Sequence, residues 1–160
     1  MPTSLVAYFS ASGTTARLAE RLAAAIGADA YQIEPEVPYT QADLNWRDRM
    51  SRSSLEMQDL SSRPALAAAD APVASADVIF LGFPIWWYRE PSIVDTFLEA
   101  YDLTGKVIVP FATSGGSGMG ETAGRLREIC GPDVRVLDGA RIAVGATSEQ
   151  LAAWVAGLGL

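Results

Sequence analysis

The sequence contains no histidine and only one cysteine, and both facts restrict the chemistry of the chain. Without histidine, the chain cannot form a Ser-His or Cys-His nucleophilic pair or an imidazole metal site. With Cys130 alone, it can form neither an internal disulfide nor a cysteine-based metal site. Cys130 follows Leu126 and Ile129 on one helical face, which favours a buried structural thiol over a reactive one. We therefore expect no metal centre.

Basic residues are also scarce. Twelve Lys and Arg stand against nineteen Asp and Glu, which gives a net charge of −7. Nucleic acids and anionic membranes bind to basic faces, so the sequence predicts no nucleic-acid partner and no attraction to an anionic membrane. The acidity would steer the chain toward proteins with basic surfaces, or it could serve solubility alone.

Long apolar runs are absent as well. No segment approaches the roughly 20 apolar residues of a membrane-spanning helix, and the N-terminus lacks the basic and apolar regions of a signal peptide. We expect no membrane insertion and a cytoplasmic location. The length of 160 residues, with 49% hydrophobic and 19% charged residues, suits one globular domain, 1–160.

Short apolar runs alternate with helical periodicity along the chain. The runs typical of buried strands are 4–10, 30–34, 76–82, 107–113 and 134–137. Helical patterns occupy 15–27, the segment from Pro91 to Tyr101, the segment after Gly120, and the residues after a Thr147–Gln150 capping box. This order predicts an α/β domain with a doubly wound, five-stranded parallel sheet. The segment "RIAVG" would continue the fifth strand or add an edge.

The segment 34–64 interrupts this alternation. It is polar and mixed in charge, it carries Tyr39 and Trp46, and a helix could begin after Thr40. A connection of this length inside a compact domain is usually functional or mobile. It could be a lid over a site, a partner surface or a disordered excursion, and we favour the lid.

A loop rich in hydroxyl groups, "SASGTT", joins the first strand to the first helix. Its residues are Ser10, Ala11, Ser12, Gly13, Thr14 and Thr15. Hydroxyl donors and free N–H groups at the positive end of a helix dipole suit a phosphate dianion. Helix capping is the alternative, but capping needs one hydroxyl rather than four. No Gly-Lys-Ser/Thr sequence follows, so this is not a Walker A loop.

Two further loops follow the third and fourth strands. "FPIWWYRE" is aromatic, and by itself could be a partner surface or a flap over the core. "TSGGSGMG", 113–120, has four glycines whose exposed amides could approach a flat polar ligand or simply form a flexible loop. In a doubly wound sheet the three loops share one edge, where ligands bind. Together they indicate a ligand with a phosphate tail and a flat heteroaromatic head, and riboflavin phosphate (FMN) has both.

In these motifs the chain resembles the flavodoxin family over essentially its whole length. The resemblance implies strand order 2-1-3-4-5 and FMN as the cofactor. It implies that the phosphate is bound by Ser10, Ser12, Gly13, Thr14 and Thr15. The first isoalloxazine loop would contain Pro84, Ile85, Trp86, Trp87 and Tyr88. The second would contain Thr113, Ser114, Gly115, Gly116, Ser117 and Gly118.

The chain departs from the family pattern in two places. The second isoalloxazine loop has no aromatic residue, so the outer face of the ring would be covered by Trp86, Trp87, Tyr88, the 34–64 segment, or nothing. No glycine lies between Pro84 and Pro91, where relatives often use one for a peptide flip toward flavin N5. The chain also lacks the long insertion of larger flavodoxins, so it resembles the short kind.

The resemblance implies a low-potential electron carrier. The cofactor would perform the redox chemistry, so we name no catalytic residue, and the partners would be a reductase and an acceptor with basic surfaces. The alternative is an FMN-dependent NAD(P)H:quinone or nitro oxidoreductase, with Arg47, Arg49 and Arg52 at a substrate slot rather than on a solvated face. A third hypothesis is a flavin-free protein-binding module. The fold does not decide among the three.

Overall fold

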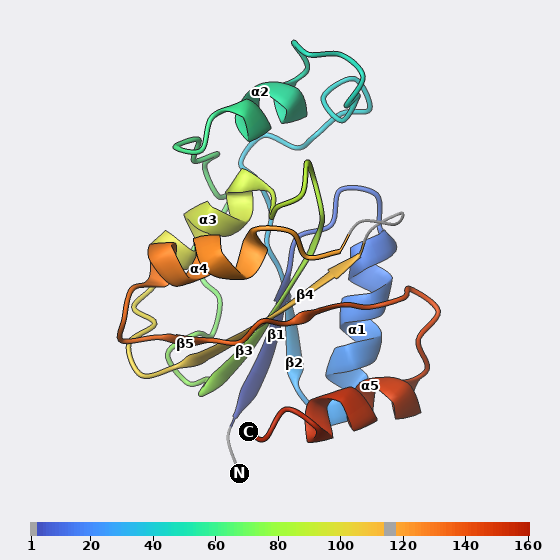
Figure 1. Ribbon diagram of the computed structural model, residues 1–160, viewed down its shortest axis with the longest axis vertical. Coiled ribbons are helices and arrows are strands. Elements are labelled where there is room, and N and C mark those ends of the chain that lie inside the picture. Colours follow the sequence, from blue (N-terminus) through green and yellow to red (C-terminus); the bar gives the residue numbers. More distant parts are fainter. Residues whose placement is uncertain (1–2, 114–117) are drawn as a thin grey trace.

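A parallel sheet with strand order β2-β1-β3-β4-β5 forms the centre of the molecule (Figure 1). The computed structural model describes residues 3–113 and 118–160. Its strands are β1 (Ser4–Tyr8), β2 (Asp29–Gln32), β3 (Val78–Pro84), β4 (Val107–Thr113), β5 (Arg135–Val136) and β6 (Ala140–Arg141). The predicted fold class and strand order are confirmed.

The edge next to β4 is made of two short strands. β5 pairs in parallel with the beginning of β4, and β6 pairs in parallel with its end. Gly139 lies between them with φ +72°, and a Cβ there would come within 2.0 Å of the Pro110 carbonyl oxygen. Only glycine tolerates this close approach. Of the segment "RIAVG", Arg141 belongs to the separate short strand β6 on the same edge, and Ile142 N donates to Ala112 O at 2.9 Å.

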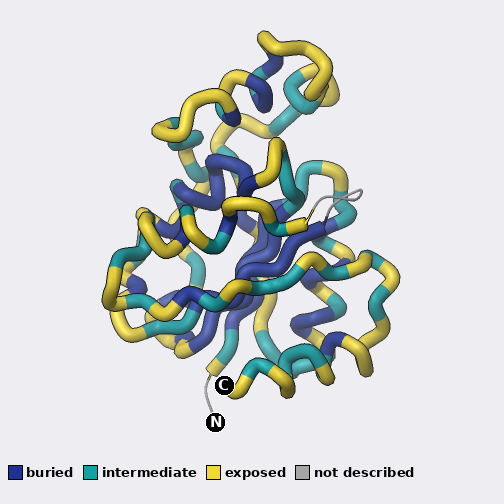
Figure 2. Tube along the Cα trace, viewed as in Figure 1, coloured by how far each residue is buried: buried dark blue, intermediate teal, exposed yellow. Residues whose placement is uncertain are grey.

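Helices cover both faces of the sheet (Figure 1). They are α1 (Thr14–Ile26), α2 (Arg52–Gln58), α3 (Ser92–Glu99), α4 (Thr122–Cys130) and α5 (Ser148–Ala156). α1 and α5 pack on one face, and α3 and α4 pack on the other. The central strands are buried, as expected for a parallel sheet between two helical layers (Figure 2). Within the two described ranges, no helix combines the length and the apolar composition needed to cross a membrane.

Local signals set the ends of several helices. α1 ends at Gly27, which has φ 67°, a left-handed conformation that glycine adopts without strain. The predicted capping box is present at α5, where Thr147 Oγ1 accepts from Gln150 N at 3.1 Å and Gln150 Oε1 accepts from Thr147 N at 2.9 Å. These reciprocal bonds satisfy two N–H groups that the helix itself leaves free.

The 34–64 segment lies above α3, beyond the ends of the strands (Figure 1). The prediction that a helix begins directly after Thr40 is wrong, because the helix of this segment begins at Arg52. Thr40 and Asp43 form a turn instead, because each side chain accepts from the other's backbone N–H. The helix of this segment is α2, and Ser51 caps it by accepting from Ser54 N.

Candidate functional site

The loop between β1 and α1 presents free N–H groups and hydroxyls. Gly13 is the N-cap residue of α1 with φ 89°, and having no side chain it cannot cap the first turn. Ser10 Oγ accepts from Gly13 N at 3.1 Å and so shapes the turn. Ser12 is exposed, and its hydroxyl donates to Thr14 Oγ1 at 3.3 Å. The positive end of α1 and the adjacent hydroxyls can therefore receive an anion.

Thr113, the last residue of β4, joins this loop to the aromatic loop. Its Oγ1 lies 2.8 Å from Thr15 Oγ1 in a buried contact, and its carbonyl oxygen accepts from Ile85 N at 3.0 Å. Thr15 is 1% exposed, so its hydroxyl connects the loops from inside. Of the predicted second ring loop, Gly118 is described and exposed, whereas 114–117 lie outside the described residues.

The aromatic loop is a tight hairpin. Trp86 N donates to Arg89 O at 3.0 Å, and Arg89 N donates to Trp86 O at 3.2 Å. The two residues between them, Trp87 and Tyr88, have φ 47° and φ 65°. Two-residue hairpins with positive φ at both positions usually contain Asn-Gly, and bulky residues there are strained. The absence of glycine thus does not prevent a left-handed backbone here.

The two adjacent tryptophans point into different surroundings. Trp86 is half-buried, and its ring meets Phe9 at 5.7 Å and Tyr39 at 5.6 Å, both edge to face. Trp87 is 43% exposed and Tyr88 is 70% exposed. Trp86 therefore joins the end of β1 to the 34–64 segment, while the tip of the hairpin faces outward.

A cavity of ≈ 570 Å³ lies between this hairpin and the 34–64 segment. Leu44, Trp46 and Ser53 form its wall on the side of the segment. The hairpin side is lined by Ile85, Trp86, Trp87 and Tyr88. Pro84, the remaining predicted residue of this loop, ends β3. The 34–64 segment therefore forms one wall of the cavity, and the aromatic hairpin forms the opposite wall.

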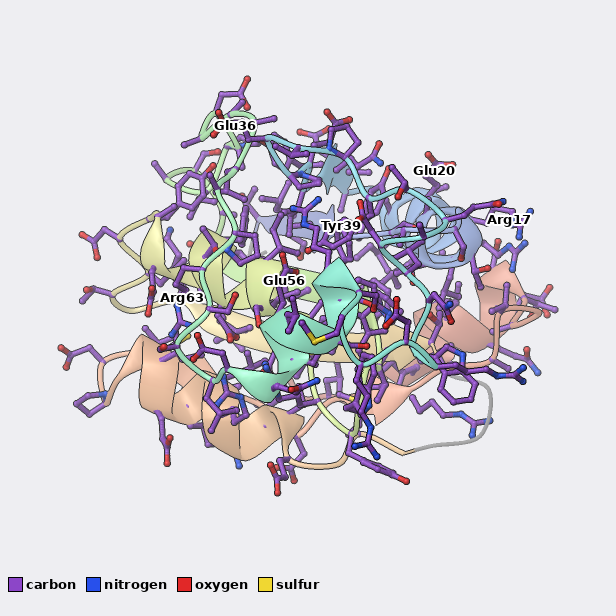
Figure 3. All side chains as sticks on the ribbon, turned by 90° about the horizontal axis from the view of Figure 1, so that it is seen from above. Arg17, Glu20, Glu36, Tyr39, Glu56 and Arg63 are labelled. Carbon is purple, nitrogen blue, oxygen red and sulfur yellow. The ribbon has the colours of Figure 1, made fainter. Side chains whose placement is uncertain are left out.

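Contacts inside the 34–64 segment hold it together. The Tyr39 hydroxyl donates to Glu56, and these two residues lie beside each other in Figure 3. Arg52 stacks its guanidinium 3.9 Å from the centre of the Tyr39 ring, and its Nε donates to Glu56 Oε2 at 3.0 Å. Burial and the neighbouring Glu56 raise the pKa of Tyr39, so its hydroxyl remains a donor.

Arg89 fastens the segment to the hairpin. It is 3% exposed, and its Nη2 lies 3.4 Å from Glu56 O and 3.2 Å from Met57 O, both at the end of α2. A cation at a helix C-terminus is favourable because the last carbonyls carry partial negative charge. Sequence reasoning missed Arg89, although its position directly after the aromatic loop was visible.

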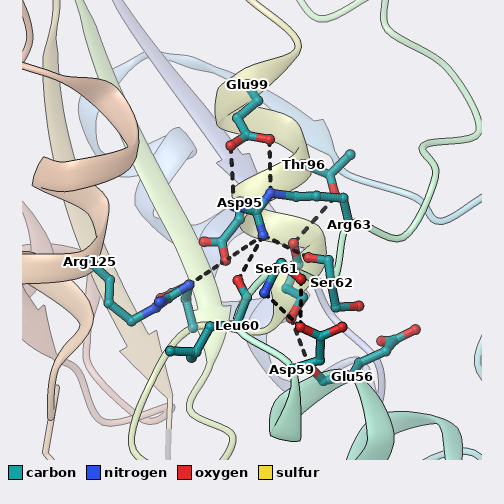
Figure 4. A network of polar contacts seen from close by, with 12 residues as sticks. Glu56, Asp59, Leu60, Ser61, Ser62, Arg63, Asp95, Thr96, Glu99 and Arg125 are labelled. Atoms are coloured by element: carbon teal, nitrogen blue, oxygen red, sulfur yellow. Dashed lines mark hydrogen bonds and ion pairs between the residues drawn. The ribbon is translucent and has the colours of Figure 1, made fainter.

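A buried ionic cluster lies behind the hairpin. Arg125 donates to Glu90 Oε1 at 2.7 Å and to Asp95 Oδ2 at 2.9 Å, and both carboxylates are 0% exposed. Arg63 approaches Asp95 from the other side and forms a forked pair with Glu99 (Figure 4). Burial, with Asp95 beside it, raises the pKa of Glu90 to about 7. This cluster was also missed, because its members come from α3, α4 and two loops that are far apart in the sequence.

Comparisons with known proteins agree with this architecture. A family model described as flavodoxin matches residues 3–158. A candidate flavoprotein from Bacteroides eggerthii DSM 20697 is 45% identical over 100% of this chain and 99% of that chain, with a TM-score of 0.93. One from Bacteroides uniformis ATCC 8492 is 43% identical over 97% of this chain and 98% of that one, with a TM-score of 0.83.

A more distant structure is a flavoprotein in complex with FMN from Lactobacillus acidophilus NCFM. It is 19% identical over 88% of this chain and 93% of that chain, with a TM-score of 0.68, and at this identity it shows a shared fold alone. No curated protein matches the chain.

Proposed function

The chain belongs to the flavodoxin family, and from this premise we propose that it binds FMN and serves as a low-potential electron-transfer protein. The observation that carries the proposal is the meeting of three β-to-α loops through Thr113, beside an aromatic cavity. FMN supplies the redox chemistry, and the residues of this chain bind and orient it. The FMN complex of the L. acidophilus structure supports the choice of cofactor.

The residues present fit such a ligand. Ser12 and Thr14 would hold the phosphate with their hydroxyls, together with N–H groups at the start of α1. Ser10 and Gly13 shape the turn through their own hydrogen bond, and Thr15 supports the loop from inside. The cavity of ≈ 570 Å³ would take the ring of the flavin, since its lining is aromatic and includes none of the residues of the phosphate loop. Its indoles supply the aromatic surface that the glycine-rich loop lacks.

The surrounding charge sets the proposed partners and potential. A net charge of −7 disfavours a negatively charged reduced flavin and so lowers its potential. The same charge favours a reductase and an acceptor with basic surfaces. As the sequence led us to expect, we also propose a cytoplasmic location.

Comparing FMN with riboflavin tests the proposal. No Lys or Arg lies between Ser10 and Thr15, so the phosphate must be held by hydroxyls, amides and the helix dipole. Titration of apo-protein followed by flavin fluorescence should show that FMN binds far more tightly than riboflavin. Thr14→Ala should weaken FMN by about 1–3 kcal/mol, the value of a hydrogen bond to a charged group, and leave riboflavin unchanged. Equal affinities for the two flavins would contradict the proposal.

An FMN-dependent NAD(P)H:quinone or nitro oxidoreductase is the second candidate. The observation that favours it is a groove next to the cavity that is lined in part by Arg47 and Arg49. NADPH consumption by the FMN-loaded protein in the presence of menadione distinguishes the two. Turnover would favour the oxidoreductase, whereas a protein that accepts electrons only from a partner reductase would favour the carrier.

A further inference from the structure

A second hollow of ≈ 600 Å³ adjoins the aromatic cavity. Its lining residues are Trp46, Arg47, Arg49, Ser54, Gln58 and Trp87. Trp46 and Trp87 line both hollows, so the two indoles form a common wall between them. We call this second hollow the outer groove.

The outer groove combines exposed aromatic rings with available positive charge. Trp46 is 64% exposed and Trp87 is 43% exposed. Within residues 3–113 and 118–160, neither Arg47 nor Arg49 forms an ion pair, although acidic residues outnumber basic ones in the chain. The Arg47 guanidinium lies 5.1 Å from the centre of the Trp46 ring, a cation–π contact. Aromatic rings and guanidinium groups together recognise flat anions.

Hydrogen bonds fix the backbone that carries these side chains. Gln58 Nε2 donates to the Arg49 carbonyl oxygen at 3.1 Å and so ties the loop to α2. The Asp48 carboxylate accepts from Met50 N at 2.9 Å and closes a local turn. Arg89 holds the same C-terminal end of α2 through the Glu56 and Met57 carbonyl groups. The backbone of the groove is therefore held in place, which reduces the entropic cost of binding.

We propose that the outer groove binds a planar aromatic molecule that carries a negative charge. The ring of this ligand stacks on Trp46 or Trp87, and its anionic group faces Arg47 and Arg49. The two indoles separate such a ligand from the cavity assigned above to FMN, so this is where a small aromatic redox reactant would approach the cofactor. That last point rests on the proposed function, whereas the binding itself does not.

Calorimetric titration of apo-protein with 2-naphthalenesulfonate tests the binding. We expect 2-naphthalenesulfonate to bind at one site. Methanesulfonate lacks the ring and 2-naphthol lacks the charge, so each should bind at least about tenfold more weakly. The double variant Arg47→Gln/Arg49→Gln should weaken 2-naphthalenesulfonate by about tenfold or more, the loss expected from a charge-assisted contact. Trp46→Ala should weaken it too, and Trp46→Phe should largely restore it.

The matched control is Arg135→Gln/Arg141→Gln, which removes two exposed arginines far along the chain on the sheet edge and makes the same change in net charge. This control variant should bind 2-naphthalenesulfonate as tightly as the wild-type protein does.

Absence of binding by the wild-type protein, or equal losses of affinity in both double variants, would overturn the proposal. Binding that FMN abolishes would also overturn it, because the probe would then occupy the FMN cavity. Failure of FMN to bind, with the probe still bound, would remove the proposed function and leave the groove assignment intact.

Discussion

At the scale of single residues, Thr113 connects the loops of the site. Its side chain contacts Thr15 and its carbonyl oxygen accepts from Ile85 N, so it fixes two of the three loops relative to each other. Both hydroxyls of the Thr15–Thr113 pair are buried. A buried hydroxyl without a partner costs more than the net value of the bond that it lost.

We expect Thr113→Val to lower both stability and FMN affinity. Valine keeps the shape of threonine but leaves the Thr15 hydroxyl without this partner, so the free energy of unfolding should fall by about 1–3 kcal/mol. Urea unfolding of apo-protein and FMN titration measure the two effects. The double variant Thr15→Val/Thr113→Val is the control, because removing both partners should cost less than removing one. A double variant less stable than the single one would show that the pair is not the cause.

The adjacent tryptophans show what the sequence could predict at this scale. The sequence placed both tryptophans in one loop at the ligand edge, and their difference in exposure follows from the contacts of Trp86 with Phe9 and Tyr39. The positive φ of Trp87 and Tyr88 was not predictable, because residue type alone favours glycine or asparagine in such a turn. The partners that hold this turn in place are far away in the sequence.

At the scale of elements, signals within a few residues predicted structure well and distant contacts were missed. α5 was predicted from Thr147 and Gln150 because its cap is complete within one turn. In the 34–64 segment several Ser, Thr and Asp residues could each cap a helix, and Thr40 formed a local turn with Asp43 instead. The place of α2 above the hairpin depends on Arg89, which lies more than thirty residues further along the chain.

The attachment of α2 to the hairpin should depend on the forked shape of the Arg89 side chain. Arg89→Lys keeps the charge but cannot reach the carbonyl groups of α2 and the Ser92 hydroxyl together. We expect faster hydrogen exchange in α2 and unchanged exchange in β1, β3 and β4, as measured by mass spectrometry. Arg127→Lys is the control, since Arg127 donates to the Val136 carbonyl oxygen and to the exposed Asp138 carboxylate near the surface, away from α2. Equal effects of both substitutions, or none in α2, would contradict the role of Arg89 as a clamp.

At the scale of the whole molecule, charge is distributed unevenly. The chain has an acidic excess, yet it buries Arg89 and most of Arg125 beside Glu90 and Asp95. A buried charge is costly even when it is paired, and Arg125 and Arg89 offset only part of the cost of burying the Glu90 carboxylate. The cluster also joins the hairpin to α3 and α4. The position of the aromatic loop is therefore linked to the protonation of buried carboxyl groups.

That linkage predicts how stability depends on pH. Burial and the nearby Asp95 raise the pKa of Glu90 from 4.5 to about 7, against the opposing effect of Arg125 and Arg89. The folded state therefore binds this proton more tightly than the unfolded state. The stability contributed by Glu90 is fully present below pH 4.5 and is lost as pH rises through about 7.

Glu90→Gln keeps an oxygen for Arg125 and removes the titration, so the free energy of unfolding of this variant should fall less steeply with pH over this window. The contribution of Asp95, whose pKa is also raised by burial, should remain. Urea unfolding from pH 4.5 to 8 measures the difference, with Glu99→Gln as the control in the exposed partner of Arg63. If the free energies of unfolding of the wild type and of Glu90→Gln changed with pH in parallel, Glu90 would not be the group that holds the proton.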